Sequence, residues 1–319
     1  MRRSVDRWNP QKKIIAEAAR ALVRGELVAF PTETVYGLGA NGLDAEAVRA
    51  IYRAKGRPSD NPLILHLANP GEAESVAFVD DRARRLINLF WPGPLTLVLP
   101  ARTGVVPPVT RGGLETVALR MPSHPVALAL IEATALPVAA PSANRSGRPS
   151  PTDADAVEED LGESLAYLLD GGPTDVGVES TVVDATGKDL LLLRPGALPL
   201  EVIAEAEGQV GLAQAGEGRR SPGTRYRHYA PDVPLLIWDG PLHWEALPGP
   251  VGYMGMADPP RPAGESVLFR TVDDYGRGLF SALRHLERAG VAVIVAQWPP
   301  QEGIGLALRD RLLRASGEG

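Results

Sequence analysis

The chain contains no cysteine, which excludes disulfide bonds, zinc sites built on thiolates and a cysteine nucleophile. It also lacks an apolar run close to the ~20 residues that a membrane-spanning helix needs. The opening Met1-Arg2-Arg3-Ser4 is basic, but the apolar core of a signal peptide does not follow it. These absences predict a cytoplasmic protein that makes no contact with membrane.

Lysine is scarce, and most of the positive charge is carried by arginine. The lysines are Lys12, Lys13, Lys55 and Lys188, and the net charge of the 319-residue chain is −6. A net negative charge argues against broad, non-specific binding to nucleic acid, although the chain can still contain a local basic groove. A lysine in such a chain, here Lys55, is therefore expected to be placed for a purpose.

Common motifs of nucleotide and hydrolase sites are missing as well. The sequence has neither a Gly-x-x-x-x-Gly-Lys-Ser/Thr loop nor a Gly-x-Ser-x-Gly elbow. The stretch 37–42 is rich in glycine, but the next predicted helix opens only after Asp44, so it is interpreted as a turn. The histidines, at 66, 124, 228, 243 and 285, show no metal-ligand spacing. We expect no metal held by protein side chains.

Apolar strand patterns and amphipathic helix patterns alternate along the chain, which is typical of an α/β fold. A polar, glycine-rich stretch near 201–231 interrupts this alternation and is interpreted as a linker. Four more apolar strand patterns and two helical patterns follow it. The sequence therefore predicts two α/β units of unequal size.

Two short segments carry the strongest functional signal. Lys55-Gly56-Arg57-Pro58 sets two cations directly after a predicted helix, either as a simple helix C-cap or as a clamp for phosphate. Pro141-Ser142-Ala143-Asn144 follows a predicted buried strand, either as a capped turn or as a ligand loop. Taken together, the segments favour a site for a phosphate-bearing ligand.

Arg120 and Arg194 each end an apolar strand pattern. A guanidinium in such a position is costly to bury without an anionic partner. The partner is either a carboxylate of the protein or the carboxylate of a small ligand. Glu179-Ser180-Thr181 opens a further strand after a glycine-rich turn. His66, inside an apolar strand, is interpreted as a hydrogen-bonded core histidine more readily than as a base.

These segments are joined by others that occur in one fixed order. They are Pro31-Thr32-Glu33-Thr34-Val35-Tyr36-Gly37-Leu38-Gly39, Asn61-Pro62-Leu63, Trp91-Pro92-Gly93-Pro94-Leu95-Thr96, Arg120-Met121-Pro122, Gly177-Val178-Glu179-Ser180-Thr181, Leu193-Arg194-Pro195-Gly196 and Ser221-Pro222-Gly223-Thr224-Arg225-Tyr226-Arg227-His228-Tyr229-Ala230-Pro231. The whole order resembles the YrdC/Sua5 family in its two-domain, Sua5-type form.

The resemblance implies a fold, namely a twisted mixed α/β sheet with a concave basic cavity and a smaller Rossmann-like α/β C-terminal domain. It places a YrdC-like catalytic domain at 1–205, a linker at 206–231 and a Sua5-type C-terminal domain at 232–319. It also implies the activity of an L-threonylcarbamoyladenylate synthase, a nucleotidyltransferase. L-threonine, bicarbonate or CO2, and ATP would give L-threonylcarbamoyl-AMP and pyrophosphate for N6-threonylcarbamoyladenosine in tRNA.

The resemblance also assigns site residues. Those around threonine would be Thr34, His66, Arg120, Ala140 and Ser180. Those around ATP would be Lys55, Arg57, Asn61, Thr116, Ser142, Asn144, Ser150, Arg194 and Tyr226. Lys55 and Arg57 are the expected catalytic cations, with Mg²⁺ bound through the phosphates of ATP.

The implied partners are the downstream machinery that transfers the threonylcarbamoyl group to tRNA, together with a weak contact to RNA. Two other functions stay open from the sequence. One is a module that binds double-stranded RNA without catalysis. The other is carbamoyl transfer to a different acceptor.

Overall fold

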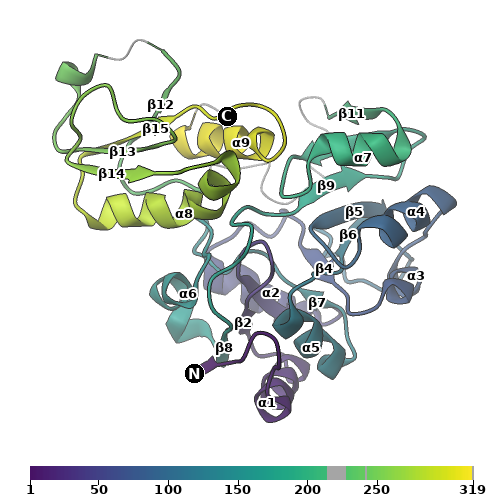
Figure 1. Ribbon diagram of the computed structural model, residues 1–319. Helices are drawn as coiled ribbons and strands as arrows, with labels where there is room; N and C mark the ends of the chain where they lie inside the picture. Colours follow the sequence, from purple (N-terminus) through teal and green to yellow (C-terminus); the bar gives the residue numbers. More distant parts are fainter. Residues whose placement is uncertain (214–227, 241–242, 318–319) are drawn as a thin grey trace.

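The computed structural model describes residues 1–213, 228–240 and 243–317. Figure 1 shows two α/β units, a large one that contains the N-terminus and a smaller one at the C-terminal end. This arrangement confirms the expected fold class. Among the described residues, we find no helix that is long and apolar enough to cross a membrane.

Within the described ranges, the large unit is built on an 11-stranded mixed sheet with the order β1-β8-β2-β3-β7-β4-β6-β5-β9-β10-β11. The strands are β1 (Arg2–Ser4), β2 (Val28–Phe30), β3 (Gly37–Asn41), β4 (Ile64–His66), β5 (Leu95–Pro100), β6 (Thr116–Arg120), β7 (Val138–Ala139), β8 (Tyr167–Asp170), β9 (Thr181–Asp184), β10 (Leu190–Arg194) and β11 (Val210–Leu212).

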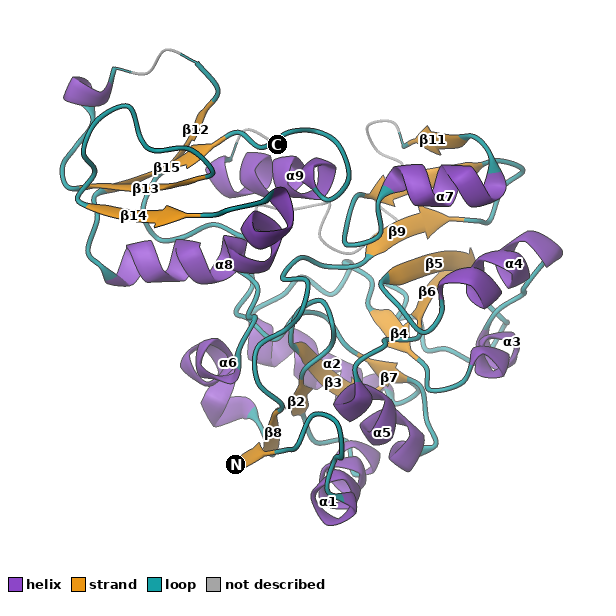
Figure 2. Cartoon of the chain, viewed as in Figure 1, coloured by secondary structure: helices purple, strands orange, loops and turns teal. Residues whose placement is uncertain are grey.

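Helices cover both faces of this sheet (Figure 2). They are α1 (Lys12–Val23), α2 (Ala45–Lys55), α3 (Ala73–Val76), α4 (Asp81–Phe90), α5 (Pro125–Thr134), α6 (Ala154–Leu161) and α7 (Leu200–Glu207), with short 3-10 turns η1 (Pro70–Glu72) and η2 (Gly162–Ser164). One core joins α2, α3, α4 and α6 to one face of the sheet. A second core joins α1 and α5 to the other face.

The alternation of side chains along the strands determines what faces each core. In β4 and β6, Leu65 and Leu119 belong to the main core. Their neighbours His66 and Arg120 therefore point to the opposite face. The two strands are parallel, and His66 is paired with Arg120 in their register. A histidine and an arginine are thereby brought side by side where the two strands end.

The smaller unit has, over the residues described, a four-stranded parallel sheet in the order β12-β15-β13-β14. Its elements are β12 (Leu235–Trp238), η4 (Trp244–Ala246), β13 (Val251–Gly255), β14 (Glu265–Leu268), α8 (Val272–Arg288), β15 (Val293–Gln297) and α9 (Gly305–Ser316). Its core includes Val35 and Val178 of the large unit. The two units therefore share apolar contacts.

The glycine-rich stretch at 37–42 is not a turn, as the sequence suggested, but contains strand β3. A Cβ atom at Gly39 would lie 2.8 Å from Phe30 Cε1, which is too close for a side chain. Here glycine serves close packing between strands. The expected linker at 206–231 also contains a strand, β11, which pairs with β10, while the domain boundaries at 205 and 231 stay a prediction.

Candidate active site

A hollow with an empty volume of ≈ 630 Å³, measured out to open solvent, lies on the face of the sheet to which His66 and Arg120 point. It collects residues that are far apart in the sequence. They are Thr32, Thr34, Val35, Tyr36, Gly37, Arg57, Leu63, Ile64, His66, Arg120, Ala140, Pro141, Ser142, Asn144, Glu179, Ser180, Arg194, His228 and Tyr229.

The sheet itself brings four of the predicted residues to one edge. His66 and Arg120 end the parallel strands β4 and β6. Ser180 precedes β9, and Arg194 ends β10, which is antiparallel to β9. Because β9 is parallel to β5 and β5 is antiparallel to β6, these strand ends meet on the same side.

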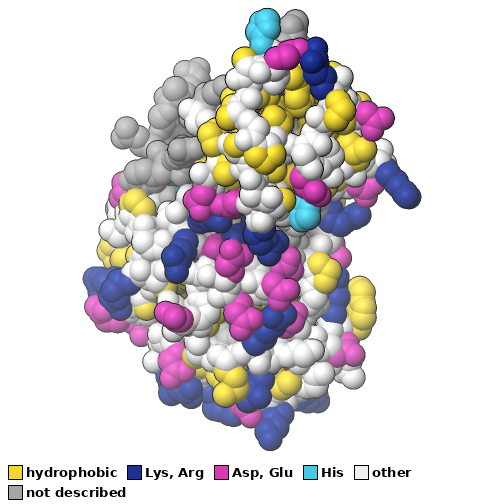
Figure 3. Space-filling model, turned by 90° about the vertical axis from the view of Figure 1, so that its left-hand side faces the viewer, with side chains coloured by type: hydrophobic (Ala, Val, Ile, Leu, Met, Phe, Trp, Pro, Cys, Tyr) yellow, Lys and Arg dark blue, Asp and Glu magenta, His cyan; other side chains and the backbone are white. Residues whose placement is uncertain are grey.

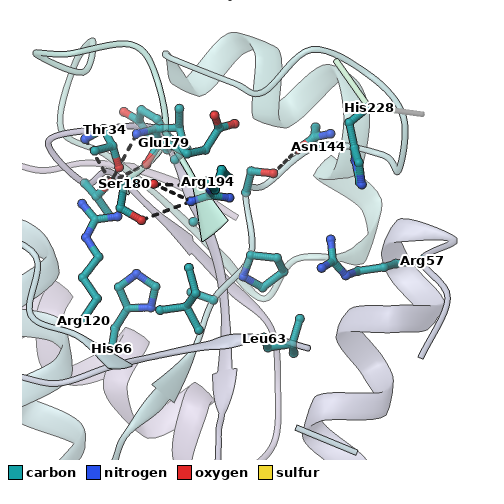
Figure 4. Close-up of a pocket in the computed structure, with 18 of the residues that line it drawn as sticks. Thr34, Arg57, Leu63, His66, Arg120, Asn144, Glu179, Ser180, Arg194 and His228 are labelled. Carbon is teal, nitrogen blue, oxygen red and sulfur yellow. Dashed lines mark hydrogen bonds between the residues drawn. The ribbon is translucent and has the colours of Figure 1, made fainter. Parts of the chain in front are cut away.

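Figure 4 shows how the side chains divide along the hollow. In this view Thr34, Ser180, Arg120 and His66 gather at one end, while Arg57, Asn144 and His228 lie at the other. Arg194 lies between the two groups. Four residues of the predicted threonine set thus lie together, as do Arg57 and Asn144 of the predicted ATP set. Which ligand each end binds stays a prediction.

Arg120 is held by a carboxylate of the protein. Its Nη2 atom lies 2.6 Å from Oε1 of Glu33, and both side chains are buried. The contact is a close charge pair without the alignment of a hydrogen bond, and the Nε atom of Arg120 donates to Gly93 O at 3.4 Å. The sequence left open whether Arg120 pairs with a carboxylate of the protein or with that of a ligand, and the structure contains the protein carboxylate, Glu33.

His66 is a neutral group in this site. Burial, followed by the neighbouring charge of Arg120, lowers the pKa of His66 to about 3. Its Nδ1 atom is buried and has no hydrogen-bond partner among the described residues. A neutral imidazole beside a guanidinium suits a polar contact to a ligand better than it suits proton transfer near neutral pH.

The segment at 32–36 forms a tight turn around Thr32. Its Oγ1 atom lies 2.8 Å from Thr34 Oγ1 and accepts hydrogen bonds from the backbone nitrogens of Thr34 and Val35. The Pro-Ser-Ala-Asn loop packs against this turn, because Leu38 N donates to Pro141 O and Ala143 N donates to Tyr36 O. Two distant segments thus form one wall.

Lys55 fastens that wall to α2. Its Nζ atom donates to Ser142 O at 2.5 Å and also to the backbone carbonyl of Asn144. Burial, with a smaller contribution from Arg57, lowers the pKa of Lys55 well below its ordinary value. Lys55 is not among the residues that line the hollow, so the structure supports a role in holding the loop in place.

Arg57 reaches the hollow itself. It follows Gly56, which ends α2 in the left-handed conformation with φ 63°, so the chain turns sharply between the two cations. Its Nη2 atom donates to Pro62 O at 3.2 Å, and its Nε atom finds no partner within the described part of the chain. Burial lowers the pKa of Arg57 to about 10, which still leaves it charged near neutral pH.

Arg194 and Ser180 are bonded to each other. Arg194 Nη2 donates to Ser180 O at 2.8 Å and to Ser180 Oγ at 3.2 Å. The serine hydroxyl also lies 2.7 Å from Thr96 Oγ1. Close beside it, a Cβ atom at Gly196 would lie 2.3 Å from the Ser180 carbonyl carbon. Glycine is required there for the strand end to approach Ser180.

The remaining predicted residues do not line the hollow or lie outside the described ranges. Ser150 is buried and donates to Glu179 Oε1 at 2.6 Å. The side-chain amide of Asn61 is buried, and its atoms find no partner among the residues described. Thr116 shares a face of β6 with Arg120 but opens that strand, and it does not line the hollow. Tyr226 lies outside the described residues.

Sequence reasoning missed several participants. It quoted Glu33 only within a motif, although this residue pairs with Arg120. It chose Tyr226 from the 221–231 segment, whereas His228 and Tyr229 of that segment line the hollow. It gave no role to Arg311, whose Nε atom donates to Glu179 Oε2 at 2.7 Å. For Arg311 the sequence offers no signal, because an arginine in an amphipathic helix usually faces solvent.

The charge in the hollow is positive, although the whole chain is acidic. Among the described residues that line it, the cations are Arg57, Arg120 and Arg194, and the carboxylate is Glu179. The outer surface differs, because Lys/Arg and Asp/Glu are interspersed on the face of the large unit seen in Figure 3. Positive charge is therefore concentrated inside, where it acts on a bound anion at low dielectric.

Comparisons with known protein families match both units of the chain. The Sua5/YciO/YrdC family model, described as telomere recombination, matches residues 20–196. The model of the threonylcarbamoyl-AMP synthase C-terminal domain matches residues 198–317.

Individual relatives match over nearly their whole length. A threonylcarbamoyl-AMP synthase of Pyrococcus abyssi is 46% identical, over 99% of this chain and 96% of the relative. One of Bacillus subtilis is 45% identical, over 95% and 93%. The crystal structure of P. abyssi Sua5 complexed with L-threonine matches with a TM-score of 0.95 and 44% identity, over 100% of this chain and 98% of that chain.

Proposed function

The chain belongs to the Sua5/YrdC family, and from that premise we propose that it is an L-threonylcarbamoyladenylate synthase. With CO2, the amine of L-threonine forms a carbamate and releases a proton. The carbamate oxygen then bonds to the α-phosphorus of ATP, and the bond to pyrophosphate breaks. When bicarbonate is the carbon source, one water is released in place of the proton. The product supplies the threonylcarbamoyl group for modification of tRNA.

The main obstacle to this reaction is repulsion between two anions, the carbamate and the triphosphate. Arg57 and Arg194 are buried cations that line the hollow. Fixed positive charge at low dielectric lowers that repulsion in the transition state without any reorganisation. The observation that carries the proposal is therefore the gathering of arginines in one hollow whose two ends fit an amino acid and a nucleotide (Figure 4).

At the amino-acid end, we assign the threonine carboxylate to Arg120. Its charge pair with Glu33 and the bond from its Nε atom to Gly93 O at 3.4 Å fix the guanidinium, and its Nη groups can grip the threonine carboxylate. Thr34, Ser180 and the neutral His66 supply polar partners for the threonine hydroxyl and amine, and Ala140 supplies apolar contact. The free amine has an ordinary pKa near ~8, so a strong general base is not required.

At the nucleotide end, we assign ATP to Arg57, Ser142, Asn144, Ser150 and Arg194. Asn61 and Thr116, which the family resemblance also assigns to ATP, do not line the hollow. Lys55 acts through the loop that it holds. The residues described contain no group of three His, Asp or Glu side chains able to hold a metal ion, and Glu179 is engaged by Ser150 and Arg311. We assign Mg²⁺ to the phosphates of ATP, with most of its waters retained, where it would offset phosphate charge.

Mass spectrometry of the product tests the proposal directly. The purified protein, incubated with ATP, Mg²⁺, L-threonine and bicarbonate, should form L-threonylcarbamoyl-AMP together with pyrophosphate. Omission of threonine or of bicarbonate should abolish pyrophosphate release. Pyrophosphate release without threonine, or failure to form the adenylate, would refute the assignment. The non-catalytic RNA-binding module is not favoured by the comparisons.

A further inference from the structure

A buried carboxylate lies in a site that we assign to anions. Glu179 lines the hollow and is only 6% exposed. Figure 4 shows it beside Arg194, between the two groups of ligand-binding residues. A carboxylate in this place would repel phosphate and carbamate strongly, because water screens the interaction little. The site therefore requires a counter-charge for Glu179.

The counter-charge comes from the smaller unit. Arg311, on α9, is fully buried, and its Nε atom donates to Glu179 Oε2 at 2.7 Å. Ser150 occupies the other carboxylate oxygen at 2.6 Å. The Arg311 guanidinium also lies 5.2 Å from the ring centre of Tyr229, which itself lines the hollow. Burial alone would raise the pKa of Glu179, but the charges of Arg311 and Arg194 hold this pKa below its ordinary value.

We propose that Arg311 is a positioning residue of the synthase, through which the C-terminal unit neutralises Glu179 and keeps the hollow attractive to ATP. Arg311 does not line the hollow, so it acts through Glu179 and not by touching substrate. Its Nη2 atom donates to Pro195 O at 3.1 Å, directly after Arg194. One side chain thus fixes both the carboxylate and the strand end that presents Arg194.

Other ion pairs hold the two units together without Arg311. Arg284 on α8 is bonded to Asp160 at 2.7 Å. Arg148 of the large unit forms a two-pronged pair with Glu287 at 2.7 and 2.9 Å. Neither pair includes a residue that lines the hollow. Arg148→Met is therefore a matched control, because it breaks contact between the units and leaves Glu179 paired.

The test measures binding of ATP by isothermal titration calorimetry, with the full chain. The inference rests on the proposed function, which is tested separately by mass spectrometry of the product made by the parent protein. ATP binding by the variants tests the role of Arg311. In Arg311→Met we expect the Kd for ATP to rise roughly 10- to 50-fold, the size expected for one unpaired charge several Å from an anion. Arg148→Met should stay within about threefold.

Two further measurements separate charge from shape. Arg311 also pairs with Asp310, which keeps Arg314 as a second partner. Glu179→Gln, added to Arg311→Met, should therefore return the Kd for ATP to within about threefold of the parent value, because the repelling charge that lines the hollow is gone. In Arg311→Met, lowering the pH should strengthen ATP binding more than it does in the parent, because loss of the Arg311 charge raises the pKa of the buried Glu179 carboxyl and favours its neutral form. A merely structural arginine would produce neither effect.

The proposal is overturned if Arg311→Met binds ATP like the parent, if Glu179→Gln does not rescue it, or if Arg148→Met weakens binding equally. Should Arg311→Met fail to fold, as judged by thermal melting, the test passes to Arg311→Lys and the Arg311→Met/Glu179→Gln double variant. Arg311→Lys keeps a positive charge beside Glu179, and the double variant removes the Glu179 charge. Both variants must bind ATP within about threefold of the parent. Weakening beyond about tenfold in either variant overturns the proposal.

Discussion

Replacement of Arg120 by methionine should impair the use of threonine far more than the use of ATP. The guanidinium lines the end of the hollow that we assign to the amino acid, and a charge-assisted, two-pronged contact to a carboxylate contributes about 2–3 kcal/mol. The KM for threonine should therefore rise roughly 30- to 150-fold. The KM for ATP should change less than about threefold, because Arg57 and Arg194 stay in place.

The same replacement also affects stability, because Glu33 loses its partner. Both members of the pair are buried, and an unpaired buried charge costs about 3–5 kcal/mol. Glu33→Gln, added to Arg120→Met, should restore most of the stability while the KM for threonine stays high. Pyrophosphate release measures both KM values, and urea denaturation measures stability. Equal rises in the two KM values, or recovery of threonine use with Glu33→Gln, would refute the assignment.

Three further predictions concern Lys55, Gly196 and the dependence of stability on pH. Lys55→Met leaves buried carbonyls of the Pro-Ser-Ala-Asn loop without a donor, so the free energy of unfolding should fall by about 2–3 kcal/mol and the KM for ATP should rise. Replacement of the exposed Lys188 by methionine is the control. Equal melting temperatures of the two variants would contradict this account. Gly196→Ala places a Cβ atom against the backbone of Ser180 and should lower both activity and the free energy of unfolding, the latter by at least about 2 kcal/mol. Gly187→Ala is the control, because the nearest atom to its Cβ is 3.9 Å away. Retained activity in Gly196→Ala would contradict this prediction. Burial, followed by the charge of Arg7, lowers the pKa of His124 to about 4; the unfolded state then binds the proton first, so stability should fall as the pH drops from about 6.5 to about 4, and His124→Gln should remove about 2 kcal/mol of that loss in urea titrations at the two pH values.

Much of the site follows from local sequence pattern. Apolar runs that end in Arg120 and Arg194 predicted strands with a cation at their carboxyl ends, and the structure contains both. The proximity of His66 to Arg120 could not be predicted in the same way. It depends on the parallel pairing of β4 with β6, a contact between distant segments that leaves no trace in either strand.

Other features escaped because their cause is tertiary. The stretch at 37–42 has the glycines of a turn, yet those at 37 and 39 serve the packing of β3 against its neighbours. Lys55 was interpreted as a phosphate clamp from its charge, whereas its ammonium binds loop carbonyls. Arg311 belongs to a helix whose pattern is ordinary. Its burial depends on the docking of the smaller unit, which residue types near it do not encode.

The position of Arg311 on α9 has a consequence for synthesis of the protein on the ribosome. Translation proceeds from the N-terminus, so Glu179, Arg194 and the rest of the hollow emerge long before the helix that neutralises the carboxylate. If Arg311 acts as proposed, a nascent large unit holds an uncompensated carboxylate that opposes nucleotide binding. Its affinity for ATP should then rise by the same roughly 10- to 50-fold when α9 docks, which couples nucleotide binding to docking of the smaller unit.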